Sequence, residues 1–129
     1  MSNINKLIGE ATAYDKKQQL EVKRPKSWLK SVSAFANGEG GTLVFGISDD
    51  DHVIGLADAE GDAERISEEI KTKLDPIPAV NLEFKEVGGK KLVLLHVYKG
   101  QETPYYYIGD KQRLAFVRVL HRIVFGSML

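Results

Sequence analysis

Positively charged side chains gather in one short stretch of this chain. Six lysines and arginines lie between residues 16 and 30, against a single acid, Glu21. Lysine and arginine are the usual phosphate ligands of nucleic-acid-binding proteins, and such contacts give an affinity that falls with salt and ignores base sequence. The stretch predicts a phosphate-binding surface, with a merely solvated basic face as the alternative. The residues expected to form it, one from near the C-terminus included, are Lys23, Arg24, Lys26, Lys30 and Arg118.

An acid and a lysine also alternate at Asp15 and Lys17. On a strand, residues two apart share a face, so both side chains could point at one phosphate. Metal-dependent nucleases use this chemistry: carboxylates hold Mg²⁺ or Mn²⁺, while a lysine stabilises the charge that builds on phosphorus. Glu10 and an acid of the turn 49–51 could complete such a site. The same spacing also occurs at Glu21 and Lys23 and at Glu83 and Lys85, so ordinary ion pairing on a solvated strand is the alternative.

A glycine cluster follows residue 37 but does not fit a phosphate loop. Phosphate loops precede a helix, where free N–H groups converge, whereas these glycines follow a predicted helix and lead into a predicted strand. We expect a helix end and a tight turn, in which Asn37 and Gly38 tolerate positive φ. The residues of this structural turn are Asn37, Gly38, Gly40 and Gly41.

Composition restricts the class of protein. The 129 residues carry a formal net charge of zero, 43% hydrophobic residues and no cysteine. One domain is expected at this length, without disulfides or a zinc–thiolate site. No apolar run approaches a bilayer span and no signal-peptide pattern opens the chain, so we expect a cytoplasmic protein and no membrane partner. Residues 49–69 hold nine acids against one arginine. This asymmetry favours a directed electrostatic surface, with mutual neutralisation of the two segments across the fold as the alternative.

Hydrophobic periodicity predicts the elements that would position these residues. Apolar residues three or four apart predict helices over residues 25–36 and 59–74, and alternation predicts a hairpin that turns at Gly88 and Gly89. Of the three tyrosines at 105–107, the outer two share a face and are expected in the core. The predicted fold is α+β, a mixed or antiparallel sheet of about six strands with two main helices packed on it. Strands are expected at 42–47, 53–56, 80–87, 91–98, 105–108 and 114–119.

The run from Ala34 to Ile47 reads AFAN-x-x-GG-T-L-x-x-G-I. This pattern resembles the Schlafen-type AlbA-like domain of bacterial transcriptional regulators and RecG-helicase-related proteins. Further segments similar to the family lie, in the expected order, at 10–17, 26–33, 53–56, 104–105 and 116–118. The resemblance covers about residues 7–119, which are expected to form the domain, with 120–129 as a C-terminal tail or truncation edge. Lys16 stands where the family usually has an aromatic residue, and the tail lacks the glycine expected after Arg118.

The resemblance implies a DNA-binding domain at the start of a longer transcriptional regulator, with no cofactor. Members of the regulator type are not generally known as nucleases, which favours a domain without enzymatic activity but does not decide the question. The nuclease branch of the family cuts RNA with three carboxylates, whose nearest counterparts here are Glu10, Asp15 and Asp49, with Lys17 beside them. A Mg²⁺- or Mn²⁺-dependent nuclease is therefore one alternative. A protein-interaction or dimerisation module, using the apolar tail and the acidic second helix, is another, and a homodimer is compatible with either DNA binding or dimerisation.

Overall fold

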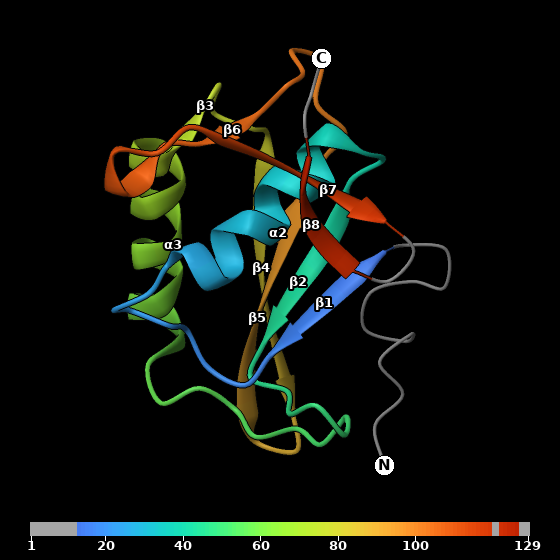
Figure 1. The fold of residues 1–129 in the computed structure, drawn as a ribbon. Helices are drawn as coiled ribbons and strands as arrows, with labels where there is room; N and C mark the ends of the chain where they lie inside the picture. Colours follow the sequence, from blue (N-terminus) through green and yellow to red (C-terminus); the bar gives the residue numbers. More distant parts are fainter. Residues whose placement is uncertain (1–12, 120–121, 127–129) are drawn as a thin grey trace.

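The computed structural model describes residues 13–119 and 122–126 of the chain. Eight strands and two α-helices lie in this part, and Figure 1 shows their arrangement. In chain order they are β1 (Tyr14–Lys17), α2 (Lys26–Asn37), β2 (Gly41–Phe45), α3 (Ala59–Lys73), β3 (Leu74–Asp75), β4 (Val80–Val87), β5 (Lys90–Val97), β6 (Tyr106–Tyr107), the 3₁₀ turn η1 (Gly109–Lys111), β7 (Leu114–Val119) and β8 (Arg122–Gly126).

The strands form two four-stranded sheets. The first has the order β1-β2-β5-β4, in which only β1 and β2 run parallel. The second has the order β3-β6-β7-β8 and is antiparallel throughout. The α+β class is thus confirmed. The predicted number of strands was too low: the described residues form eight strands in two sheets, whereas about six strands in one sheet were predicted.

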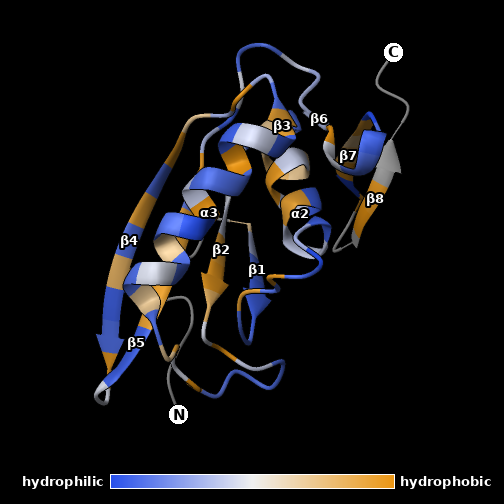
Figure 2. Cartoon of the chain, turned by 90° about the vertical axis from the view of Figure 1, so that its left-hand side faces the viewer, coloured by the Kyte–Doolittle hydropathy of each residue, from blue (hydrophilic) through white to orange (hydrophobic). Residues whose placement is uncertain are grey.

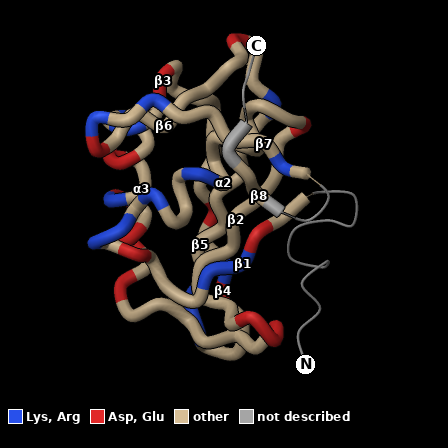
Figure 3. Tube along the Cα trace, viewed as in Figure 1, with Lys and Arg blue, Asp and Glu red and all other residues tan. Residues whose placement is uncertain are grey.

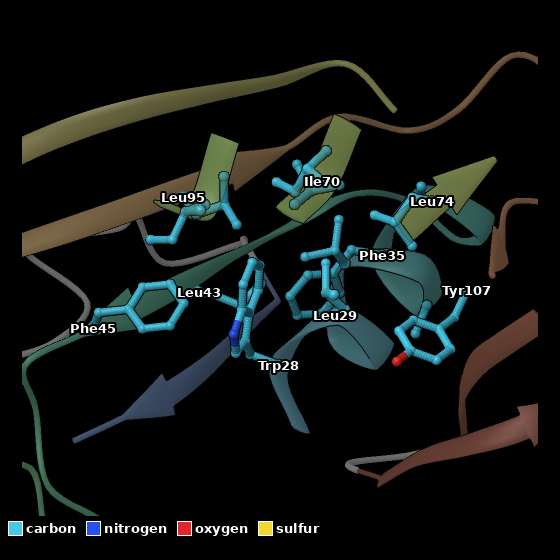
Figure 4. Close-up of a cluster of buried hydrophobic side chains, with 14 of the residues drawn as sticks. Trp28, Leu29, Phe35, Leu43, Phe45, Ile70, Leu74, Leu95 and Tyr107 are labelled. Atoms are coloured by element: carbon cyan, nitrogen blue, oxygen red, sulfur yellow. The ribbon is translucent and has the colours of Figure 1, made fainter. Parts of the chain in front are cut away.

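Helix α2 lies between the two sheets, and Figure 2 shows this layering. One side of the helix packs on β2 and β5, and another packs on β6, β7 and β8. Trp28 is 1% exposed, and its ring meets Phe45 edge-on, with 5.9 Å between the centroids. Figure 4 shows the buried side chains that surround it. A helix covered on two sides buries nearly every residue of its middle, and all residues from 31 to 36 are buried.

Helix α3 covers the first sheet beside α2 and has clear end signals. The side chain of Asp58 accepts a hydrogen bond from the N–H of Gly61, which caps the start of the helix. Two acids in the first turn and two lysines in the last turn complement the helix dipole. Ile66 and Ile70 point into the core. The predicted bounds 59–74 differ from the observed ones by one residue.

Two segments differ from the sequence prediction. Residues 53–56 were expected to form a strand, but only one isolated bridge forms there, between Ile47 and Val53. The chain instead folds back along Gly46, whose carbonyl accepts hydrogen bonds from the N–H groups of Ile54 and Gly55. Residues 120–129 were assigned to a tail, yet 122–126 form β8, which pairs with β7. Residues 120–121 and 127–129 lie outside the described part.

Candidate nucleic-acid interface

The predicted basic residues of α2 and the connection before it line one open hollow of about 670 Å³. Figure 3 shows blue segments in α2 and in the connection that leads into it, next to α3. Four of the five predicted cations are among the lining residues, and α3 adds Lys73. We call this surface the basic hollow. Its lining residues are Val22, Lys23, Arg24, Pro25, Lys26, Ser27, Lys30, Lys73, Asp110, Leu114 and Phe116.

The cations of the basic hollow are mostly free of carboxylates. In the described part of the chain, no ion pair joins Lys23, Arg24, Lys26 or Lys30 to an acid. Lys26 donates to the side-chain oxygen of Gln112, which is neutral, at 3.0 Å. A cation without a paired acid keeps its charge available to a ligand. The acids of 49–69 therefore do not mask these four residues.

Lys73 was missed by sequence reasoning, because it lies in α3, far along the chain from the basic stretch. Its amino group forms an ion pair with Glu69, four residues earlier on the same helix, at 2.8 Å. One carboxylate, Asp110, also lines the hollow and accepts a hydrogen bond from the hydroxyl of Tyr107. Five cations and one acid lining the hollow make it electropositive, although Lys73 contributes less than the four unpaired cations.

The main-chain N–H groups at the start of α2 contribute little to this positive charge. The N–H groups of Ser27 and Trp28 donate to the carbonyls of Arg24 and Pro25, so they are not free to bind an anion. Pro25 occupies the N-cap without a side-chain hydrogen bond. The hydroxyl of Ser27, in contrast, is buried and has no hydrogen-bond partner among the described residues. Charged side chains rather than main-chain donors thus dominate the electrostatics of the hollow.

Arg118 does not line the basic hollow. Its guanidinium donates to the carbonyl of Tyr14 at 3.2 Å and lies 5.7 Å from the centre of the Phe35 ring. These contacts join β7 to β1 and α2. Arg118 therefore has a structural role in the described fold, and its predicted contact with phosphate remains a prediction.

Asp15 and Lys17 share a face of β1, as alternation predicts, and that face is turned towards α2. The Asp15 carboxylate accepts a hydrogen bond from the hydroxyl of Ser31 at 2.7 Å. The Lys17 amino group donates to the carbonyl of Ser27 at 3.2 Å and lies 3.8 Å from Asp15. Both side chains thus attach β1 to α2; they form the ion pair of the alternative interpretation, but on a face that packs on the helix and not on a solvated strand.

The acidic turn 49–51 lies against the other face of β1. Lys16 donates to the Asp49 carbonyl and to the Asp51 carboxylate, each at 2.7 Å. The hydrogen bond to Asp51 raises the pKa of Lys16, so this lysine stays protonated and paired. Among the described residues, no three acids or histidines come close enough to hold a metal ion. Glu10, the third predicted carboxylate, lies outside the described residues.

The local basic stretch thus converges in space, whereas the described acids and histidines form no group of three that could hold a metal ion. The sequence model of the family described as Schlafen, AlbA_2 matches residues 10–124. The chain belongs to the Schlafen AlbA_2 family. Of the segments that carry the resemblance, 13–17, 26–47 and 116–118 lie on or next to β1, α2, β2 and β7, whereas 53–56 and 104–105 lie outside the named strands and helices.

Solved structures share the fold of this Schlafen AlbA_2 domain. The N-terminal domain of a RecG-related protein from Nitrosomonas europaea is 22% identical, with a TM-score of 0.65 over 89% of this chain and 82% of that chain. A protein from Corynebacterium diphtheriae is 24% identical, with a TM-score of 0.66 over 92% of this chain. This chain spans 22% of the latter protein's length. No curated protein matches the sequence.

Asn37 holds the Schlafen AlbA_2 domain together at the far end of α2. Its amide N–H groups donate to the carbonyls of Tyr105 and Phe116, each at 3.0 Å, and its oxygen accepts from the N–H of Tyr105 at 2.6 Å. Ser33 adds hydrogen bonds to the same two residues. Sequence reasoning assigned Asn37 to a turn and missed this role, because the partners lie far along the chain.

The glycine turn after α2 is confirmed, with one correction. The positive φ lies at Gly40, at +86°, and not at Asn37 or Gly38. A Cβ atom at Gly40 would lie 2.8 Å from the carbonyl oxygen of Val97, so the turn also requires the missing side chain. The turn feeds directly into β2 at Gly41. The cluster is explained by the helix end and this close approach.

The three tyrosines divide as alternation predicts. Tyr105 and Tyr107 are buried, whereas Tyr106 is half-buried with the Arg113 guanidinium 4.2 Å from its ring centre. Burial, with a further contribution from Asp110, raises the pKa of Tyr107 to about 12. Lys26 lies 5.7 Å from the Tyr107 ring, so this tyrosine lies just beneath the basic hollow.

In the described part of the chain, no helix has the length and apolar character needed to cross a membrane.

Proposed function

We propose that this domain binds DNA through phosphate contacts made by the basic hollow. The observation that carries the proposal is the convergence of Lys23, Arg24, Lys26 and Lys30 on one concave surface without acids paired to them. Such an array attracts a polyanion from solution and exchanges its counterions for phosphates. The family assignment supports the choice of a nucleic acid, and the family's place in bacterial regulators favours DNA.

In this proposal the domain serves a cytoplasmic transcriptional regulator and needs no cofactor. The nuclease alternative is not adopted, because Asp15 is bonded to Ser31 on one face of β1 and the acidic turn contacts Lys16 on the other. Phosphate contacts alone do not read base sequence. Selective regulation would therefore require further contacts, or domains beyond this chain.

The binding proposal is tested by fluorescence anisotropy with single- and double-stranded DNA and RNA at two salt concentrations. Wild-type protein should bind at low salt, and its affinity should fall steeply as salt rises. The double variant Lys26→Glu and Lys30→Glu should lose about 10- to 100-fold in affinity, since two attractive charges become repulsive. Clearly tighter binding of RNA would correct the choice of DNA.

A matched control separates this surface from net charge. Lys90→Glu with Lys99→Glu makes the same change in charge on exposed residues outside the basic hollow. We expect this control to bind within about twofold of wild type at moderate salt, where distant charges are screened. Equal losses in both double variants, or no binding at low salt, would overturn the proposal.

The regulator role needs its own experiment. Genomic DNA fragments retained by the protein can be sequenced and compared with the input. A regulator should enrich particular promoter-proximal fragments, whereas contacts to phosphate alone should retain all fragments evenly. Even retention would leave DNA binding intact and reject the regulatory role for this chain.

A further inference from the structure

Strand β4 forms an open edge of the first sheet. In the described part of the chain it pairs only with β5, and Figure 2 shows it at the outer side of the sheet. It is eight residues long and contains no proline. An open strand of this length can hydrogen-bond to a further strand, so natural proteins usually shield such edges.

The hairpin geometry decides which main-chain groups face the open edge. A two-residue turn, Gly88 and Gly89, joins the strands, and the flanking Val87 and Lys90 are partners. In such a hairpin the flanking pair exchanges hydrogen bonds, and bonded and non-bonded pairs then alternate along the strands. The N–H of Tyr98 donates to the carbonyl of Ala79, which fits this alternation. The main-chain N–H and C=O groups of the odd-numbered residues of β4 therefore hydrogen-bond to β5. Those of the even-numbered residues point outwards, towards the open edge.

Phe84 lies in the middle of this edge and is 52% exposed. It shares the inner face of the sheet with Val80 and Leu82, which pack against the core. Helix α3 covers this face over β5 and leaves Phe84 beyond its cover. A large aromatic ring at the centre of an unpaired strand provides apolar area for a partner strand.

The charges beside Phe84 favour a particular partner. Glu83 and Lys85 flank it on the opposite face of the sheet and lie 3.2 Å apart as an ion pair. We propose that two copies of this chain associate through antiparallel pairing of β4 with β4, with Phe84 opposite Phe84 of the second copy. In this register Glu83 of each copy faces Lys85 of the other. The pairing is symmetric and closed, as a two-fold dimer requires.

The alternative registers are disfavoured by charge. Outward-facing residues must pair with outward-facing residues, so the register can shift only in steps that keep this parity. One step in one direction places Glu83 opposite Glu83, and one step in the other places Lys85 opposite Lys85. Like charges directly opposite each other destabilise a strand pair. Of these three registers, the one centred on Phe84 is the one that places residues of opposite charge opposite each other.

The dimer is tested by sedimentation equilibrium of the full chain over about a hundredfold range of concentration. An interface of one strand pair and two aromatic rings is small, so we expect a dissociation constant on the order of 10–100 µM. Phe84→Glu should shift this constant upwards at least about tenfold, because two carboxylates would meet at the centre. The control Ile54→Glu, at a side chain that is 45% exposed in the loop between β2 and α3, should dimerise like wild type.

The register is tested by cysteine pairing, for which a chain without native cysteine is suited. Opposed residues of a non-hydrogen-bonded pair have Cα atoms about 4.5 Å apart, within disulfide range. A mixture of Glu83→Cys and Lys85→Cys chains should therefore form a covalent dimer on mild oxidation. The control mixture, Asn81→Cys with Lys85→Cys, should form much less, because these positions are not opposed.

Each unfavourable outcome rejects a defined part of this inference. Wild-type protein that stays monomeric throughout the concentration range would overturn the dimer. Equal weakening by Phe84→Glu and Ile54→Glu would place the contact elsewhere. Equal cross-linking in both cysteine mixtures would reject the register. None of these results bears on the basic hollow, since monomeric protein can bind DNA through it.

Discussion

The two ends of helix α2 differ in how their polar groups are used. At the C-terminal end, Asn37 and Ser33 bond to the backbone of β7 and of the segment that leads into β6. At the N-terminal end, the helix has no side-chain cap, the hydroxyl of Ser27 has no partner among the described residues, and Lys30 has no paired acid there. One end thus fixes the helix in the fold, and the other presents charge to solvent. Substitutions at the two ends should separate stability from binding.

The largest effect on stability is expected from Asn37→Ala. The substitution leaves backbone groups of Tyr105 and Phe116 without one of their partners, and it should lower the free energy of unfolding by about 2–4 kcal/mol. Urea denaturation measures the change. Asn81→Ala, at an exposed position, is the control and should change stability by less than about 0.5 kcal/mol. A loss below about 1 kcal/mol for Asn37→Ala would show that the bonded end does not anchor the helix.

High pH should weaken the fold through Tyr107, which lies under the other end of α2. Its pKa is raised to about 12 in the folded protein, above its ordinary value of 10.0. Between these two pH values the Tyr107 hydroxyl keeps its proton in the folded state but loses it in the unfolded state. Its contribution to the free energy of unfolding is therefore complete below pH 10 and is lost as pH rises towards 12. Urea midpoints measured across this range should fall.

Tyr107→Phe should make that alkaline fall shallower, because phenylalanine has no hydroxyl to ionise. Tyr98→Phe, at an exposed tyrosine, should leave the fall unchanged. The test is the difference between the pH profiles of the three proteins, because their other ionisable groups are the same. If the urea midpoints of Tyr107→Phe and of wild type fell identically with pH, the Tyr107 hydroxyl could not be a buried group that stays neutral in the folded protein.

A cation in the basic hollow and a cation held by acids should behave differently towards DNA. Arg24→Ala should lower affinity roughly three- to tenfold and reduce the slope of log affinity against log salt by about 0.9, the value for one phosphate contact. Lys16→Ala removes the same charge from a residue bonded to Asp51, and it should change neither quantity. Anisotropy titrations at several salt concentrations give both numbers. Equal slopes for the two variants would mean that charge, and not placement, determines binding.

The smallest effect is expected from Glu69→Gln, which releases Lys73 from its ion pair. Affinity for DNA should rise about two- to threefold, while stability should fall by about 0.3–0.5 kcal/mol. Glu68→Gln makes the same change in charge at an exposed neighbour outside the hollow. A gain in affinity shared equally by both variants would reflect net charge alone.

Local structure was largely predictable from the sequence, and long-range pairing was not. The helices and the β4–β5 hairpin follow from periodicity and from the Gly88–Gly89 turn, so their bounds fall within one residue of the prediction. The division into two sheets depends on pairings such as that of Leu74 with Tyr107. Strands of two residues carry too little pattern to reveal such a partner.

The candidate site shows the same division. The cations between residues 23 and 30 are close in sequence and on one helix start, so their convergence was predictable. Lys73 reaches the hollow through the packing of α3, which no local pattern encodes. The opposite orientations of Asp15 and Lys16 were predictable, because neighbouring residues of a strand face opposite sides. The contact of Lys16 with the acidic turn depends on long-range folding and was not predictable.

The sandwiching of α2 between two sheets has a consequence for how this family can diversify. The helix backbone beneath the hollow is set by buried residues of α2 such as Trp28 and Leu29. Lys23 and Arg24 at its rim are exposed, and substitutions of exposed side chains usually change stability little. Rim residues can therefore be exchanged during evolution, or by a protein engineer, with small risk to the scaffold. An acidic, neutral or aromatic rim on the same backbone should therefore change which ligand the hollow accepts while leaving the fold in place.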